Sequence, residues 1–419
     1  MTPPIVLVGG GFESVRGPGR RGIPIYAGTR DWRVPLRSSK YVTAIPAPPS
    51  IWSEKFTGWL ESVLRDLPGA VVVPLNDDVA WRLSSYVELE DPDSRHFAVG
   101  SFASVRIANL KGRLAEACGI GGVPTPATVV LSDDASLEEA AGRLSFPLAV
   151  KPQTRVGMQH WTRGRVVRNP RELAEAAAWF RCEVRYREAL LEDAPDAAFP
   201  IAQEFIRRPG PEVYHIAGYL AASGSSAVKA HRKLLQVPLR FGSGVLFETA
   251  PVNEVAAAGL LRLLAQIGYH GMFEAEFLEQ NGEPLLIDLN VRPYNGMSLE
   301  LAQGLDLMSL AWLEASGQCE QLEAELAAAR AVPLREVVWA DQAVLASLMA
   351  GQLLSGGMTP REAGGHLAWL WRHRSHTVSH YFSRDDLRPG FMHLLRHARS
   401  AVTRPREFAG HYLRRGLDR

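Results

Sequence analysis

Short runs of apolar residues alternate with helical patterns over the first hundred residues. The run Ile5-Val6-Leu7-Val8 precedes three glycines, and Val71-Val72-Val73-Pro74 reads as a second buried strand. Between them, one helical face is marked by apolar residues at Trp52, Phe56, Leu60 and Leu64. This alternation of strand and helix predicts a parallel α/β domain over residues 1–108.

The next two predicted units differ in their hydrophobic pattern. Residues 110–118 form a helical pattern that ends in glycines, and strand and helix signals then alternate across residues 109–198. Residues 199–330 instead show long strands at 201–206, 213–222 and 227–235, a helix at 254–267, and strands 272–278 and 285–290. These last two strands flank the turn Glu279-Gln280-Asn281-Gly282 and predict a hairpin with alternating faces.

The character of the chain changes again after residue 331. A helical segment leads into an Arg/His-rich tail, which from Arg372 onward carries eleven arginines against four acidic residues. The acids and aromatic residues interspersed in it favour a folded, helical, basic extension over residues 331–419. The alternative is a tail that docks an acidic partner or a membrane surface.

Composition restricts the class of protein only broadly. The chain has 419 residues, of which 46% are hydrophobic and 22% charged, and its net charge of +1 gives no global field for a nucleic acid. No segment approaches the ~20 apolar residues that span a bilayer, so we expect a cytoplasmic protein without a membrane span. Cys118, Cys182 and Cys319 lack metal-site spacing and are expected to be reduced thiols.

The predicted hairpin carries the most informative polar residues. Asp288 and Asn290 lie two apart and so share one face of a strand, and the hairpin can bring Glu276 beside them. Carboxylate and amide oxygens of this kind suit Mg²⁺. Arg292, on the same face, can hold a phosphate or carboxylate through two hydrogen bonds. The alternative is a hairpin whose polar face merely meets solvent.

This pattern resembles the closing motif of the ATP-grasp superfamily, an acid on one strand and acid-x-Asn-x-Arg on the next. The resemblance covers about residues 110–317 and implies an ATP-grasp fold behind a leading parallel α/β domain. Carried over residue by residue, it makes Glu276, Asp288 and Asn290 ligands of Mg²⁺ or Mn²⁺. It makes Arg292 a catalytic arginine. Asp288 departs from the many members that have Glu there, and its shorter side chain would shift the metal slightly.

The resemblance also implies an ATP site upstream of the hairpin. Lys111, at the start of a helix, and Lys151, at the end of a strand, match the two lysines that offset the triphosphate charge. The residues that match contacts to adenine and ribose are Gln203, Glu204, Ile206 and Glu212. Taken singly, each lysine is more often a surface residue, and Glu212 could be only a turn residue before a strand.

Three further features leave alternatives open. The resemblance implies that Arg232 or Lys233 faces the transferred phosphoryl group, but the choice depends on strand register, and both could lie on a surface strand. The segment Asn76-Asp77-Asp78 follows a predicted strand, where it could bind a ligand or cap a helix. Glu274 stands where D-alanine:D-alanine ligases have arginine, so we expect this protein to bind the substrate carboxylate in a different way from those ligases.

Within the superfamily, the sequence most resembles predicted carboxylate-amine ligases of the D-aspartate ligase-like type. That resemblance rests on Ser39-Lys40-Tyr41, on Pro74 with Asp77, and on residues 292–298. It implies an ATP-dependent ligase that joins a carboxylate to an amine through an acyl-phosphate and releases ADP and phosphate. The expected substrates are amino acids or a peptide, and a homodimer is the default assembly. The alternatives are an ATP-grasp kinase, a thiol ligase, or a nucleotide-binding regulatory protein without turnover.

Overall fold

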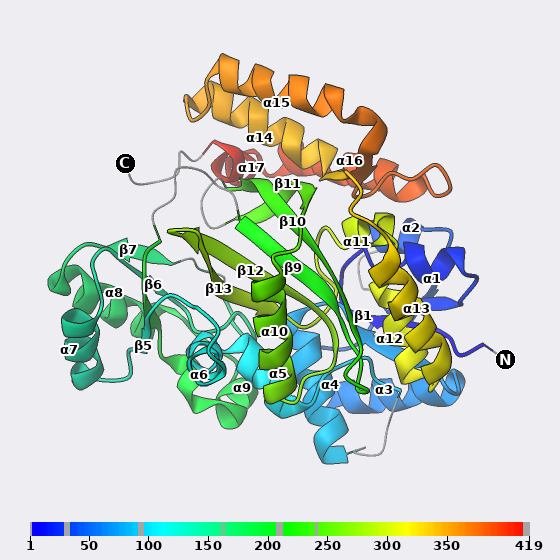
Figure 1. Ribbon diagram of the computed structural model, residues 1–419, viewed down its shortest axis with the longest axis horizontal. Helices are drawn as coiled ribbons and strands as arrows, with labels where there is room; N and C mark the ends of the chain where they lie inside the picture. The colour runs from blue at the N-terminus through cyan, green and yellow to red at the C-terminus, as the bar shows by residue number, and fades with distance from the viewer. Residues whose placement is uncertain are drawn as a thin grey trace.

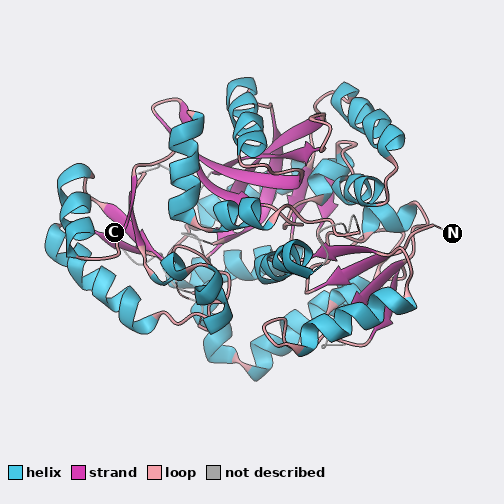
Figure 2. Cartoon of the chain, turned by 90° about the horizontal axis from the view of Figure 1, so that it is seen from below, coloured by secondary structure: helices cyan, strands magenta, loops and turns pink. Residues whose placement is uncertain are grey.

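The computed structural model describes residues 2–28, 34–90, 96–160, 162, 164–206, 213–238 and 242–413. The described chain contains three β-sheets with helices packed around them (Figure 1). A parallel sheet lies near the N-terminus, a small antiparallel sheet lies at the opposite end, and a seven-stranded sheet lies between them; the view from below separates the three (Figure 2).

The parallel sheet has the strand order β3-β2-β1-β4. Gly9, directly after β1, has φ +107°, and a side chain there would meet the Asn76 amide 2.8 Å away. Gly9 therefore lets the chain turn tightly beside the end of β4. The elements of this unit are β1 (Ile5–Val8), α1 (Arg16–Arg20), β2 (Ile25–Gly28), α2 (Pro35–Ser38), β3 (Val42–Ile45), α3 (Lys55–Asp66), β4 (Val71–Pro74) and α4 (Asp77–Glu90).

Two helices, α5 (Phe102–Asn109) and α6 (Lys111–Gly121), connect this unit to the small sheet, whose strand order is β5-β8-β6-β7. Its own apolar core lies between the sheet and two covering helices. Its elements are β5 (Thr128–Val130), α7 (Asp134–Arg143), β6 (Leu148–Lys151), β7 (Arg165–Val167), α8 (Pro170–Glu183), α9 (Glu188–Asp193), η1 (Pro195–Ala198) and β8 (Ile201–Glu204).

The large sheet has the order β13-β12-β9-β10-β11-β14-β15. The predicted hairpin is present: β12 (Gly271–Gln280) and β13 (Glu283–Asn290) meet at a turn in which Asn281 and Gly282 both have positive φ. That backbone is the one that fits the twist of a two-residue hairpin. The remaining elements of this part are β9 (Val213–Leu220), β10 (Ser226–Val237), β11 (Ser243–Ala250), α10 (Glu254–Gln266), α11 (Ser298–Ala302), α12 (Leu307–Ala315) and α13 (Cys319–Ala331).

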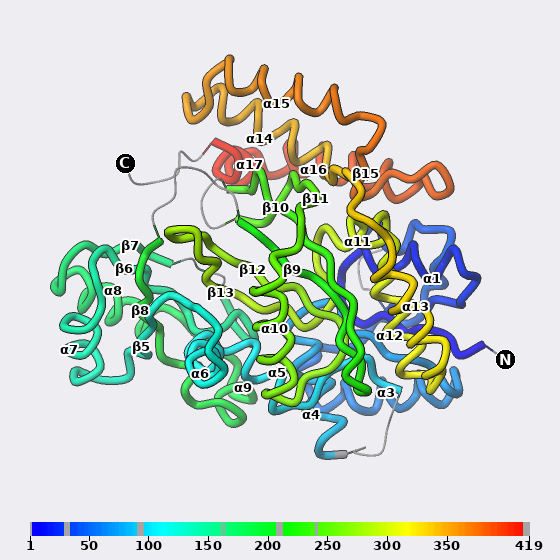
Figure 3. Tube along the Cα trace, viewed as in Figure 1, coloured from blue at the N-terminus to red at the C-terminus, as the bar shows by residue number. Residues whose placement is uncertain are grey.

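The C-terminal segment is mainly helical, but it also adds two strands to the large sheet. These are β14 (Val338–Ala340), which pairs with β11, and β15 (Thr377–Ser379). Its helices lie above the end of the sheet in Figure 3. They are α14 (Gln342–Ser355), α15 (Pro360–Arg372), η2 (Arg374–His376), α16 (Arg388–Thr403) and α17 (Pro405–Tyr412). The expected helical extension is thus also part of the central sheet.

Side-chain bonds fasten this extension to the N-terminal unit. Asp385 accepts hydrogen bonds from Arg20 Nε (2.9 Å) and from the Tyr41 hydroxyl (2.6 Å), and Ser39 donates to Asp386.

Within the described residues, no helix combines the length and the apolar content that crossing a bilayer requires. The three cysteines form no disulfide with one another.

Candidate active site

A cavity of about 1110 Å³ opens between the three sheets. The parallel sheet supplies its wall through the loop after β1 and through Asn76 and Asp77 after β4. The small sheet supplies Lys151 and Gln203, and the large sheet supplies the hairpin face. Because each wall comes from a different unit, a ligand in this cavity would contact all three.

Strand pairing brings the predicted metal ligands together. Glu276 on β12 lies directly opposite Asp288 on β13, and Glu274 lies opposite Asn290. All four side chains line the cavity. The hairpin register therefore sets two carboxylates and a carboxamide side by side, as their spacing predicted.

Two lysines neutralise these carboxylates. Lys111, the first residue of α6, makes a close ion pair with Asp288, and Lys233 Nζ lies 3.2 Å from Glu276 Oε2. Burial would raise the pKa of Asp288, but the Lys111 charge outweighs it and lowers the pKa to about 2. Asp288 is therefore ionised throughout the physiological range. The donor set fits Mg²⁺ or Mn²⁺, because it consists of the carboxylate and carboxamide oxygens that these ions prefer as protein ligands.

The predicted nucleotide residues lie along the neighbouring wall. Lys151 donates to Gln203 Oε1 (2.8 Å), which fixes both side chains between β6 and β8. Burial and the nearby Lys111 charge lower the pKa of Lys151 to about 7. Glu204 and Ile206 also line the cavity, although the Glu204 carboxylate accepts from the Ser145 backbone N–H (3.0 Å). Glu212 lies outside the described residues.

The register of β10 resolves the choice between the two cations on it. Lys233 faces the cavity, whereas the adjacent Arg232 is exposed and does not line it. Successive side chains of a strand point to opposite faces, so only one of the two can reach the site. The structure thus does not bring Arg232 to the predicted catalytic position.

Arg292 is held by a carboxylate of the N-terminal unit. Its Nε and Nη2 donate to the two oxygens of Asp77 at 2.7 and 3.0 Å. Burial alone would lower the pKa of Arg292, but Asp77 more than offsets this and raises it. The adjacent Asn76 caps α4 by accepting from the Val79 N–H (2.9 Å). Asn76 therefore caps the helix, as one alternative predicted, and Asp77 lines the cavity, where ligand binding by this segment stays a prediction.

A buried network on the cavity face of the large sheet, beside the hairpin residues, was missed in the sequence. Glu274 Oε1 lies 3.1 Å from His215 Nδ1 and 3.4 Å from His231 Nε2, and Glu300 lies 2.9 Å from His231 Nδ1. Burial would raise the pKa of Glu274, but bonds to the two histidines hold it well below its usual range. Burial lowers the pKa of His215, whereas the two carboxylates overcome burial at His231 and raise its pKa to about 9.

The network orients one predicted metal ligand. Asn290 Nδ2 donates to Glu274 Oε2 (2.9 Å). Since an ionised carboxylate only accepts hydrogen bonds, the amide nitrogen must face Glu274 and the amide oxygen must face away from it. The signal available in the sequence was the position of Glu274, which lies two residues from Glu276 and so on the same strand face.

No known family profile matches the sequence, and a search of curated proteins finds no match. Solved structures do match. The biotin carboxylase–beta-gamma-ATP complex from Campylobacter jejuni has a TM-score of 0.60 at 16% identity, covering 75% of this chain and 71% of its own. The L-amino acid ligase from Bacillus licheniformis has a TM-score of 0.57 at 17% identity, covering 80% and 79%.

A third match is N5-carboxyaminoimidazole synthetase from Staphylococcus aureus, with a TM-score of 0.55 at 13% identity and coverage of 80% and 81%. At such low identity, the likeness concerns the course of the backbone. It extends over 75 to 80% of this chain in these three structures. The chain therefore has the ATP-grasp fold that the sequence resemblance predicted.

Proposed function

We propose that this protein is an ATP-dependent ligase that joins a carboxylate to an amine through an acyl-phosphate. The observation that carries the proposal is the convergence of Glu276, Asp288 and Asn290 with Lys111 and Lys233 in one cavity of an ATP-grasp fold. The similar structures also support the proposal, because they include an L-amino acid ligase and a biotin carboxylase in complex with beta-gamma-ATP.

The residues suggest a division of labour along the cavity. Lys111 and Lys151 would bind nucleotide phosphates, and the Gln203 to Ile206 segment would hold the adenine. Mg²⁺ or Mn²⁺, held by the hairpin residues, would offset the charge of the phosphates. Lys233 and Arg292 would stabilise negative charge where a substrate carboxylate attacks the γ-phosphate. An amine would then attack the acyl-phosphate carbonyl and release phosphate, so no enzyme nucleophile is required.

Product analysis tests this mechanism. The purified protein would be offered amino acids and small carboxylates in pairs, with ATP and Mg²⁺, and nucleotide products would be separated chromatographically. We expect ADP and phosphate, formed only when a productive carboxylate is present. Formation of AMP and pyrophosphate would rule out the acyl-phosphate route, and a phosphorylated product that persists with every amine would indicate a kinase instead.

Lys151 should make ATP binding depend on pH. Its pKa of about 7 means that most of the ligand-free sites hold it neutral at pH 8. ATP phosphates favour the charged form, so binding at pH 8 should take up close to one proton, and affinity should fall by up to about tenfold per pH unit above pH 7.

Calorimetry in buffers of different ionisation enthalpy measures this uptake directly. Lys151→Arg remains charged at every pH used, so its proton uptake at pH 8 should disappear while the wild-type fold persists. Equal uptake by the variant and the wild type would assign the proton to another group.

Glu274 should control the metal site without touching the metal. Glu274→Gln can donate as well as accept, so the amide of Asn290 is no longer forced to turn its oxygen outward. We expect Mn²⁺ affinity, measured by electron paramagnetic resonance in the presence of ADP, to weaken about 10-fold to 100-fold.

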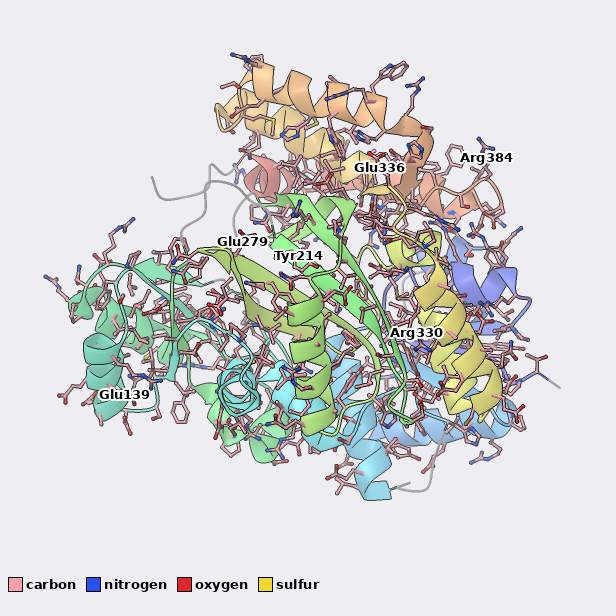
Figure 4. The ribbon with its side chains drawn as sticks, viewed as in Figure 1. Glu139, Tyr214, Glu279, Arg330, Glu336 and Arg384 are labelled. Atoms are coloured by element: carbon pink, nitrogen blue, oxygen red, sulfur yellow. The ribbon has the colours of Figure 1, made fainter. Side chains whose placement is uncertain are left out.

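Glu279→Gln is the matched control, since Glu279 is exposed at the turn end of the same strand (Figure 4). Its Mn²⁺ affinity should equal that of the wild type. Unchanged affinity in Glu274→Gln would mean that Asn290 does not bind the metal, or that Glu274 does not orient it.

A further inference from the structure

The exposed large apolar side chains are concentrated in the C-terminal segment. Of fourteen such side chains in the described residues, eleven lie after residue 331. Five of them belong to α16 or its N-cap and are exposed by 42 to 80%: Leu387, Phe391, Leu394, Leu395 and Val402. We call these five residues the apolar stripe, because spacings of three, four and seven place them on one face of the helix.

Contacts on the opposite face of α16 keep the apolar stripe facing solvent. His393 stacks on Tyr381 with ring centroids 4.0 Å apart, and His397 bonds Ser347 at 2.7 Å. Gly390 packs so closely on Phe382 that a side chain there would clash. Because these contacts anchor one face of the helix, the apolar stripe cannot rotate inward without breaking them.

The charged side chains of α16 itself all have one sign. α16 contains no acidic residue, and the exposed Arg388, Arg396 and Arg399 lie along one edge of the stripe. Within the described residues, none of these three makes an ion pair with a carboxylate. The acids just before the helix, Asp385 and Asp386, are already bonded to the N-terminal unit. The arginine charges are therefore available to an anionic surface.

We propose that the apolar stripe of α16 and its flanking arginines bind an anionic membrane surface. A helix with an apolar face bordered by arginines can lie in the headgroup region, where the apolar side chains are buried and the guanidinium groups meet lipid phosphates. Antiparallel two-fold pairing with a second copy would set these arginines against each other along one side of the interface. A lipid surface also adapts to a convex helix, and neither the active-site cavity nor the smaller cavity beside Arg20 includes a residue of α16.

Vesicle sedimentation of the full-length protein tests this. We expect the protein to sediment with vesicles of phosphatidylcholine mixed with phosphatidylglycerol, and much less with phosphatidylcholine alone. The double substitution Phe391→Ser with Leu395→Ser should weaken binding at least about tenfold. Replacing Arg388, Arg396 and Arg399 by Gln should weaken it about fivefold per residue.

Exposed residues elsewhere supply matched controls. Val255→Ser, on α10, and Arg65→Gln, on α3, should bind vesicles as the wild type does, and circular dichroism should show every variant folded. Wild-type binding by the stripe and arginine variants would overturn the proposal, as would failure of the wild type to bind anionic vesicles. Concentration-dependent dimers that Phe391→Ser abolishes, without vesicle binding, would show that a second copy covers the stripe instead.

Discussion

Asp288→Ala is expected to reduce ATP turnover on the order of 10³-fold, as when an enzyme loses a preorganised electrostatic group. Asp288 lies opposite Glu276 across the hairpin and pairs with Lys111, so it belongs both to the proposed metal site and to the charge balance around it. Its loss would leave one carboxylate to hold the metal and would free Lys111 from its partner.

The fold should survive this substitution. Asp288 lies at the cavity surface with 37% of its side chain exposed, and Lys111 can reach solvent in the cavity once it is released. The measurement is ADP release at saturating substrates over a Mn²⁺ titration, together with the melting temperature. Glu283→Ala, an exposed position on the same strand, should retain full activity. Wild-type turnover by Asp288→Ala would remove the metal assignment.

The hairpin site was predictable because it depends on local rules. The alternation of side chains along β13 and the Asn-Gly turn determine which residues share a face, and both are visible in sequence. The two lysines were found through the family resemblance instead. The structure places Lys111 and Lys151 in the cavity, and their contact with a nucleotide stays a prediction.

Contacts between distant segments were not predictable in this way. The pairing of Arg292 with Asp77 joins residues far apart in the chain, and the His231 network depends on which strands are neighbours. β14 and β15 have three residues each, too few for alternation to be recognised. The Ser39 to Tyr41 segment suggested a subfamily, yet its side chains fasten the C-terminal extension.

Arg292→Ala is expected to lower kcat about 100-fold while changing ATP affinity less than about threefold. Arg292 lies beyond the hairpin ligands, where transferred phosphoryl and acyl groups would meet, so its contribution should grow as charge develops in the transition state. Removing an interaction of that kind lowers kcat but leaves the ground-state affinity for ATP nearly unchanged. Calorimetric ATP affinity measured beside steady-state turnover separates the two.

The bond to Asp77 offers a second explanation, in which Arg292 only fastens the N-terminal unit to the hairpin. Asp77→Asn distinguishes the two, because it weakens the pair but leaves the guanidinium in the cavity. If Arg292 acts on the reacting groups, Asp77→Asn should retain most of the turnover that Arg292→Ala loses, although both variants melt at a lower temperature. If the Arg292–Asp77 pair only holds the N-terminal unit against the hairpin, Arg292→Ala, Asp77→Asn and the double variant should all lose the same amount of turnover and of stability. If Arg292→Ala instead loses ATP affinity at unchanged kcat, Arg292 contributes to binding of ATP in the ground state and not to the transition state.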